Sequence, residues 1–114
     1  MKRVSAKWHV FLSLVLINVF MVGTVLAADI KDGHALVNPA PDDRYAIDGF
    51  IFAEADLSGY MNDLKQSDQI TGIVLRRGKS ASEAQRRGIA EIAATLQLEA
   101  FEQDGRKLTP LQVD

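Results

Sequence analysis

The stretch that decides the fold is QITGIVLRRGKSASEAQRRGIAEIAATLQ, residues 69–97. Its first part contains the apolar run Ile73-Val74-Leu75, which predicts a strand buried on both faces in the middle of a sheet. Small and apolar residues then recur every three or four positions from Ala81 to Leu96, which predicts a helix over residues 81–97. A buried strand that leads directly into an amphipathic helix indicates an α/β domain.

The helix has a start motif and a polar face. Ser80-Ala81-Ser82-Glu83 matches a capping box, with Ser80 as the N-cap and Glu83 at the third helical position. The outer, solvent-facing side is predicted to carry five polar residues: Gln85, Arg86, Arg87, Glu91 and Gln97.

The Gly-Lys-Ser at residues 78–80 resembles the end of a phosphate-binding P-loop, but the spacing is wrong. A P-loop requires G-x-x-x-x-G-K-[ST], with glycines five residues apart. Gly72 and Gly78 are six apart, and the residues between them belong to the predicted strand. The motif therefore does not predict a nucleotide site, and no cofactor is expected.

A weaker binding site remains open at the same junction, because free backbone N–H groups at a helix start favour an anion. It would bind an anion or a partner's carboxylate. The alternative is that Gly78 only makes the turn, Ser80 only caps the helix and the basic side chains are solvated. The candidate residues are Arg76, Arg77, Gly78, Lys79, Ser80, Arg86 and Arg87.

The rest of the domain follows the same pattern. Residues 45–53, YAIDGFIFA, predict a strand that is bulged or bent at Gly49, and a helix follows with Leu57, Tyr60, Met61 and Leu64 on one face. After residue 97, strands over 98–103 and 106–113 are joined by the turn dipeptide Asp104-Gly105. Pro110 places the last strand at an edge of the sheet.

The predicted order is strand, helix, strand, helix, hairpin: a small single α/β domain over residues 45–114. Two crossovers would make the first strands parallel, with both helices on one face or one on each.

Residues 1–27 have the features of a signal peptide. Lys2, Arg3 and Lys7 precede an apolar run from Trp8 to Leu26, and the sequence predicts cleavage after Ala27, with Ala28 as the next site. The alternative is an uncleaved N-terminal anchor, since the run is long enough to cross a bilayer. Residues 28–44, rich in Gly, Pro and Asp, predict a flexible lead-in.

Composition excludes several functions. The 114-residue chain has no cysteine, so thiol catalysis and thiolate metal sites are absent. Without the leader's three basic residues, 10 of the 13 remain against 15 acidic ones, a formal charge of −5 that disfavours nucleic acid. His34 is the single histidine after the leader and lies in the predicted lead-in, so no catalytic residue and no metal site are assigned.

These observations predict a periplasmic or secreted non-enzymatic binding or accessory protein, such as an inhibitor or immunity-type protein or a subunit of an envelope complex. Its partner would be another protein of the cell envelope, and an acidic surface suits a basic target. A small core without disulfides is also compatible with a homo-oligomer, and membrane attachment is expected only if the leader is retained. The alternative is a small hydrolase of the envelope that uses carboxylates such as Glu54 and Asp56.

Overall fold

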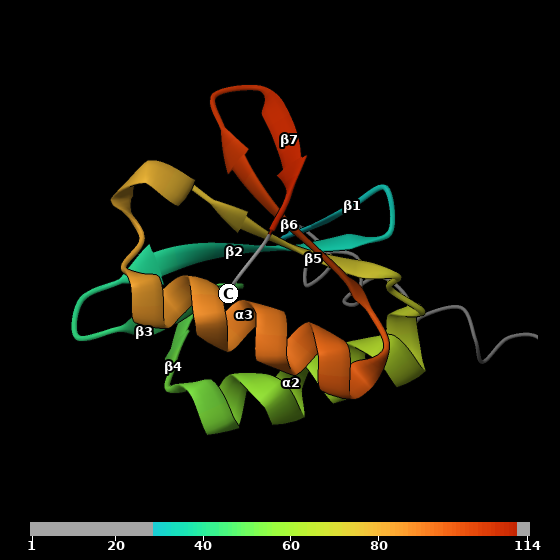
Figure 1. Cartoon of the computed structure of the whole chain (residues 1–114). Coiled ribbons are helices and arrows are strands. Elements are labelled where there is room, and N and C mark those ends of the chain that lie inside the picture. The colour runs from blue at the N-terminus through green and yellow to red at the C-terminus, as the bar shows by residue number, and fades with distance from the viewer. Residues whose placement is uncertain (1–28, 112–114) are drawn as a thin grey trace, which may run out of the picture.

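The structure is a computed structural model that describes residues 29–111. The predicted leader lies outside these residues, so export stays a prediction. The described residues form a mixed seven-stranded sheet with two α-helices, which confirms a small α/β domain (Figure 1). The elements are β1 (Ile30–Lys31), β2 (His34–Ala40), β3 (Arg44–Ile47), β4 (Phe50–Phe52), α2 (Glu54–Asp68), β5 (Gly72–Arg76), the short 3-10 turn η3 (Gly78–Ser80), α3 (Glu83–Leu96), β6 (Glu99–Asp104) and β7 (Lys107–Pro110).

The sheet is built around β5. The strand order is β4-β3-β2-β5-β6-β7, with β1 paired to β2 beside β3. β5 runs parallel to both of its neighbours, β2 and β6, whereas the other pairs are antiparallel. Ile73, Val74 and Leu75 are at most 1% exposed, so the predicted central strand is confirmed. The β6–β7 hairpin and the edge position of Pro110 are also confirmed, but the two loop residues are Gly105 and Arg106, because Asp104 still pairs with Lys107.

The prediction of a flexible lead-in over residues 28–44 is wrong for its larger part. Residues 34–40 form β2, which lies between β5 and β3, and its Ala35 and Val37 are fully buried. Pro39 is tolerated because β2 pairs with β5 only through Val37, so Pro39 pairs with β3 alone. The domain therefore begins at β1 rather than at residue 45.

The predicted single strand over residues 45–53 is two strands. Asp48 and Gly49 have φ values of 54° and 83°, the positive values that a type I′ hairpin turn requires at both central positions. β3 and β4 therefore form an antiparallel hairpin, and β3 is antiparallel to β2. The predicted parallel pairing is confirmed for β5 with β6. Residues 45–53 do not pair in parallel, because β3 is antiparallel to both β2 and β4.

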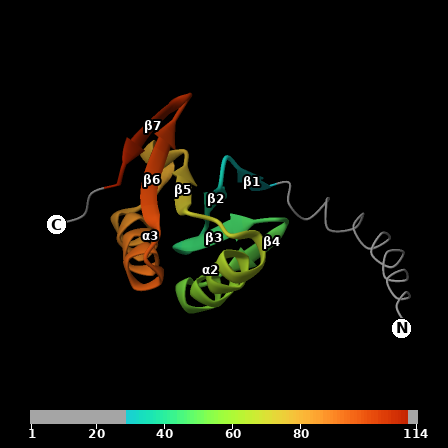
Figure 2. The same cartoon turned by 90° about the vertical axis from the view of Figure 1, so that its right-hand side faces the viewer.

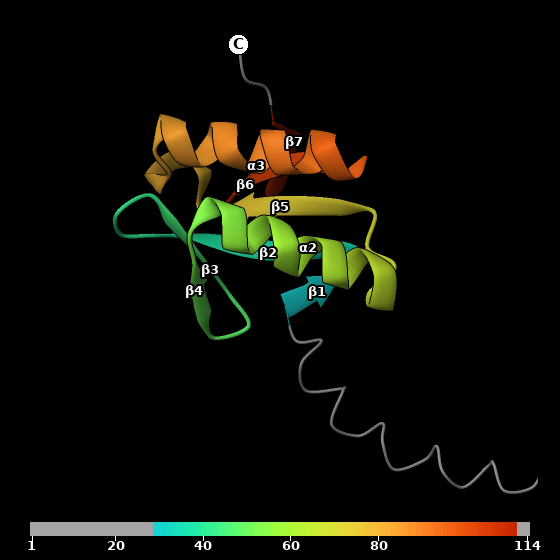
Figure 3. The same cartoon turned by 90° about the horizontal axis from the view of Figure 1, so that it is seen from below.

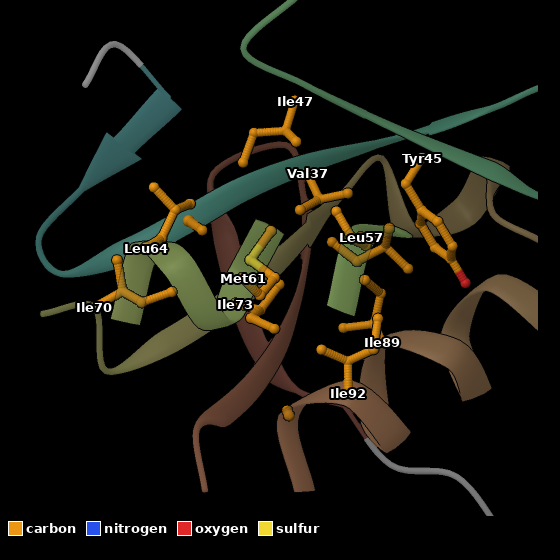
Figure 4. Packing of buried hydrophobic residues seen from close by; sticks show 13 residues of the cluster. Val37, Tyr45, Ile47, Leu57, Met61, Leu64, Ile70, Ile73, Ile89 and Ile92 are labelled. Atoms are coloured by element: carbon orange, nitrogen blue, oxygen red, sulfur yellow. The ribbon is translucent and has the colours of Figure 1, made fainter. Parts of the chain in front are cut away.

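Both helices cover the same face of the sheet, and the core lies beneath them (Figures 2 and 3). Leu57, Met61 and Leu64 of α2 are buried, as the helical spacing predicts. They meet Ile89 and Ile92 of α3 over the central strands (Figure 4). The opposite face of the sheet carries no helix in the described part of the chain.

The start of α3 differs from the prediction. Ser82, not Ser80, is the N-cap: its Oγ accepts a hydrogen bond from Gln85 N at 3.0 Å, and Ser82 N donates to Gln85 Oε1 at 2.9 Å. Ser80 instead ends η3, where its N–H donates to Arg77 O. Two Ser-x-x-Glu/Gln capping boxes overlap in this sequence, one starting at Ser80 and one at Ser82. The chain uses the second because Ser80 belongs to η3, so α3 begins after it.

The helical pattern predicted Gln85 on the solvent-facing side of α3, but the structure places it in the interior. It is 3% exposed, and its Nε2 donates to Ala40 O at 2.9 Å and to Arg44 O at 2.7 Å. Tyr45 Oη donates to Gln85 O at 3.2 Å, and burial raises the pKa of Tyr45 to about 12. Gln85 thus ties α3 to both ends of the β2–β3 connection.

Candidate functional site

The helix-free face of the sheet carries the side chains that alternate with the core. Ala35, Ile73 and Ala100 share one register position and face the helices, so their strand neighbours face the other way. Leu36, Val74 and Phe101 form the next position, on the helix-free face. Val74 is 1% exposed yet does not belong to the cluster under the helices. This face therefore has an apolar floor of its own.

Two hairpins border this floor. The β1–β2 hairpin and the β6–β7 hairpin both rise from the sheet on the side away from the helices (Figures 1 and 2). Between them lies a cavity of about 250 Å³, which we call the sheet groove. It is lined by Lys31, Asp32, His34, Leu36, Val74, Arg76, Gln103, Arg106 and Leu108.

The sheet groove is positively charged in a domain that is otherwise acidic. Lys31, Arg76 and Arg106 line it, and Asp32 is its single carboxylate. The helical layer has the opposite balance, since α2 and α3 together carry six acidic residues and three basic ones. A cleft of one charge raises the local concentration of ligands of the other charge, so the groove favours an anion.

The floor of the groove combines aromatic and aliphatic groups. The His34 ring lies against Phe101, with ring centroids 5.1 Å apart. Gly72 permits this placement because a Cβ on it would lie 2.9 Å from His34 Cδ2. Leu108 remains 41% exposed on the β6–β7 side. The groove thus offers an apolar surface next to guanidinium groups.

Of the seven predicted site residues, only Arg76 lines the sheet groove. Lys79 is exposed at η3, and its backbone N–H donates to Asp104 Oδ1 at 3.0 Å. The N–H groups of Ser80 and Ala81 donate to Arg77 O and Gly78 O. Acceptors of the chain itself therefore use the N–H groups that an anion at this turn would need, and the anion site proposed there stays a prediction.

The other predicted residues separate. Arg86 is half-buried, with Nε 3.2 Å from Glu102 Oε1 and Nη2 donating to Gly78 O at 2.8 Å, so it fastens η3 and α3 to β6. Gly78 is buried because its Cα faces Glu102, where a Cβ would lie 2.7 Å from Oε1. Arg87 is exposed on α3, 3.8 Å from Glu83. Arg77 is exposed with a left-handed φ of 54°.

Most of the groove was not predicted because the residues of β2 were interpreted as an irregular segment. The signal present in them is the short apolar run Ala35-Leu36-Val37, of which Ala35 and Val37 are buried in the structure. Lys31 and Arg106 lie at hairpins far apart in the sequence, and only the pairing of β2 and β6 with β5 brings them to one cavity.

A second cavity, of about 430 Å³, lies on the helical side between α2 and α3. It is lined by Glu54, Ala55, Ser58, Glu91, Ile92 and Thr95. Partial burial raises the pKa of the Glu54 carboxyl, and a hydrogen bond with Glu91 and the negative charge of Glu91 raise it further. We call Glu54 and Glu91 the carboxyl pair. Asp56, the partner that the sequence suggested for Glu54, does not line this cavity.

Within residues 29–111, no three His, Asp or Glu side chains are grouped so that they could hold a metal ion. The same residues include no helix with the length and apolar character needed to cross a membrane. The chain matches no family model, no curated protein and no solved structure. The groove's own chemistry is therefore the basis for a functional proposal.

Proposed function

We propose that this domain is a non-enzymatic binding protein of the cell envelope, periplasmic or secreted, which holds a partner protein on the helix-free face of its sheet. The observation that carries the proposal is the sheet groove, in which Lys31, Arg76 and Arg106 surround an apolar floor. An accessory subunit of an envelope complex and an inhibitor or immunity-type protein both fit this role.

The charge of the groove changes the expected target. The net acidity of the chain suggested a basic partner, but the groove is the cationic part of the surface and suits an acidic segment. The acidic helical layer of a second copy could also reach the groove, and self-association is therefore one outcome of the test.

The test is recovery of the partner from the cells that produce the protein. The full chain is tagged at its C-terminus and compared with Arg76→Ser and Arg44→Ser. Both variants remove one exposed guanidinium, from the groove and from β3 respectively. A partner identified by mass spectrometry should be retained by wild type and Arg44→Ser and lost by Arg76→Ser. Equal recovery with all three proteins would contradict the proposal.

A second candidate function is hydrolysis, because the carboxyl pair couples an acid with a raised pKa to a neighbouring carboxylate. Ser58 and Thr95 line the same cavity. The measurement is release of soluble fragments from peptidoglycan by wild type, Glu54→Gln and Glu91→Gln. Fragment release that is abolished in both variants would favour the hydrolase over the binding protein.

A further inference from the structure

We propose that the sheet groove recognises the C-terminal end of its partner's polypeptide: the terminal carboxylate contacts the guanidinium groups, and the last side chain, which is apolar, lies on Leu36 and Leu108. This inference rests on the proposed function and names the chemical group that the groove selects.

The first argument is the arrangement of charge and apolar surface. Arg76 and Arg106 line the same small cavity as Leu36, Val74 and Leu108. A guanidinium binds a carboxylate through two parallel hydrogen bonds, a geometry that an ammonium group cannot supply. The ligand that satisfies both surfaces carries a carboxylate directly beside an apolar group.

The second argument is size. The cavity of about 250 Å³ is below the range of about 300–1,000 Å³ for sites that enclose small molecules. A terminal residue carries its carboxylate and its side chain on one Cα. In an extended internal segment, residues on the same side are about 7 Å apart. A terminal residue therefore presents its carboxylate and its apolar group within a shorter span than an internal Asp or Glu and its apolar neighbour do.

The third argument is the single acidic residue of the lining. Asp32 lies at the β1–β2 turn, on the opposite side of the groove from Arg106 in the β6–β7 hairpin. A segment with several carboxylates would place one of them near Asp32. A polypeptide end with one carboxylate avoids this repulsion, and a basic residue earlier in the partner's chain would be attracted to Asp32. Capture of a C-terminal carboxylate is a recurrent mode of peptide recognition.

The test is an NMR titration of the ¹⁵N-labelled protein with three synthetic peptides. The first is Gly-Ser-Gly-Ser-Gly-Ser-Ala-Leu with a free C-terminus. The second is the same peptide as its C-terminal amide, and the third is that amide with a glutamate in place of the last serine, two residues before the leucine. We expect the free acid to bind at least about tenfold more tightly than either amide, with shifts at the amides of His34, Val74 and Gln103.

Matched variants locate the effect. Arg76→Ser and Arg106→Ser should each weaken binding of the free acid by about tenfold, whereas Arg44→Ser, at an exposed arginine of β3 outside the groove, should leave it unchanged. Equal binding of acid and amide, tighter binding of the internal glutamate peptide, or no binding of the acid would each overturn the inference. If the recovered partner still depends on Arg76 in those cases, the proposed function stands and only the identity of the recognised group is wrong.

Discussion

Gln85 shows how a single polar residue can be essential to a small core. Its side chain satisfies two carbonyl oxygens of the β2–β3 connection and the N–H of the helix cap, all from one buried position. Buried polar groups that lose a partner keep their full desolvation cost. Gln85 therefore holds α3 against the sheet through hydrogen bonds and is not part of a solvated helix face.

We predict that Gln85→Leu lowers the free energy of unfolding by about 2–4 kcal/mol, because it leaves several buried polar groups without partners. The control is Gln66→Leu on the exposed side of α2, which should stay within about 0.5 kcal/mol of wild type. Urea unfolding followed by circular dichroism measures both. Equal effects of the two substitutions would show that Gln85 does not fasten α3 to the sheet.

At the scale of elements, the two helices meet at Gly88. A Cβ at this position would lie 2.2 Å from Tyr45 Oη and 3.0 Å from Glu54 Oε1. A Cβ on Gly59 in α2 would have no packing neighbour within 4 Å. Both glycines are helical, so they differ in packing and not in backbone conformation.

Gly88→Ala should therefore lower the free energy of unfolding by about 1–3 kcal/mol through overpacking, although alanine is the better helix former. Gly59→Ala should raise the free energy of unfolding by up to about 1 kcal/mol, the ordinary gain in helix propensity. Thermal melts of the two variants should move in opposite directions from wild type. A stabilised Gly88→Ala would contradict the close contact between α3, Tyr45 and Glu54.

We predict that the carboxyl pair makes the stability of the domain dependent on pH. The pKa of Glu54 is raised in the folded state, so its contribution to stability is fully present below the unfolded value of 4.5 and is lost as pH rises through the folded value. Glu91→Gln removes one charge of the pair. It should raise the melting temperature at neutral pH, and this gain should shrink as pH falls toward about 4.5.

The control for this prediction is Glu83→Gln, on the same helix but beside Arg86 and Arg87. It should lower the melting temperature slightly or leave it unchanged at neutral pH, since it removes a weak attraction. Melts between pH 4 and pH 8 distinguish the two cases. A Glu91→Gln protein that is less stable than wild type at neutral pH would rule out repulsion within the pair.

The elements predicted best are those whose formation depends on local sequence alone. β5 and α3 have strong apolar patterns, and the β6–β7 hairpin has Gly105 in its turn. β2 was missed because Gly33, Asn38 and Pro39 count against a strand when only local preference is considered. Pairing with β5 and β3 supplies the stabilisation that local preference lacks.

The Asp-Gly dipeptides are a further signal. One of them predicted a hairpin, and the other two were not recognised as hairpin turns. Asp32-Gly33 and Asp48-Gly49 both have positive φ values at their two residues, as in type I′ turns. They close the β1–β2 and β3–β4 hairpins. In the β6–β7 hairpin the same dipeptide lies one position earlier, and the loop residues are Gly105 and Arg106. Asp32-Gly33 is the turn signal that lies inside the predicted lead-in.

At the scale of the whole molecule, the main consequence is a domain with two unlike faces. One face of the sheet is covered by the two helices (Figure 3). The helices have an acidic surface, and the other face of the sheet holds the cationic sheet groove. The sequence left open whether the helices share a face, so it could not predict that a face of the sheet is free. It predicted Arg76 as a binding residue but assigned it to a helix start rather than to a groove.

The central claim is that the partner lies on the helix-free face, and site-specific photo-crosslinking in the producing cells tests it most directly. A photoreactive phenylalanine replaces Leu108, which is 41% exposed in the sheet groove, or Thr95, which is exposed on the helical side. We predict a covalent adduct with one partner protein from position 108 and none from position 95. An adduct from position 95 alone, or equal adducts from both, would contradict the claim.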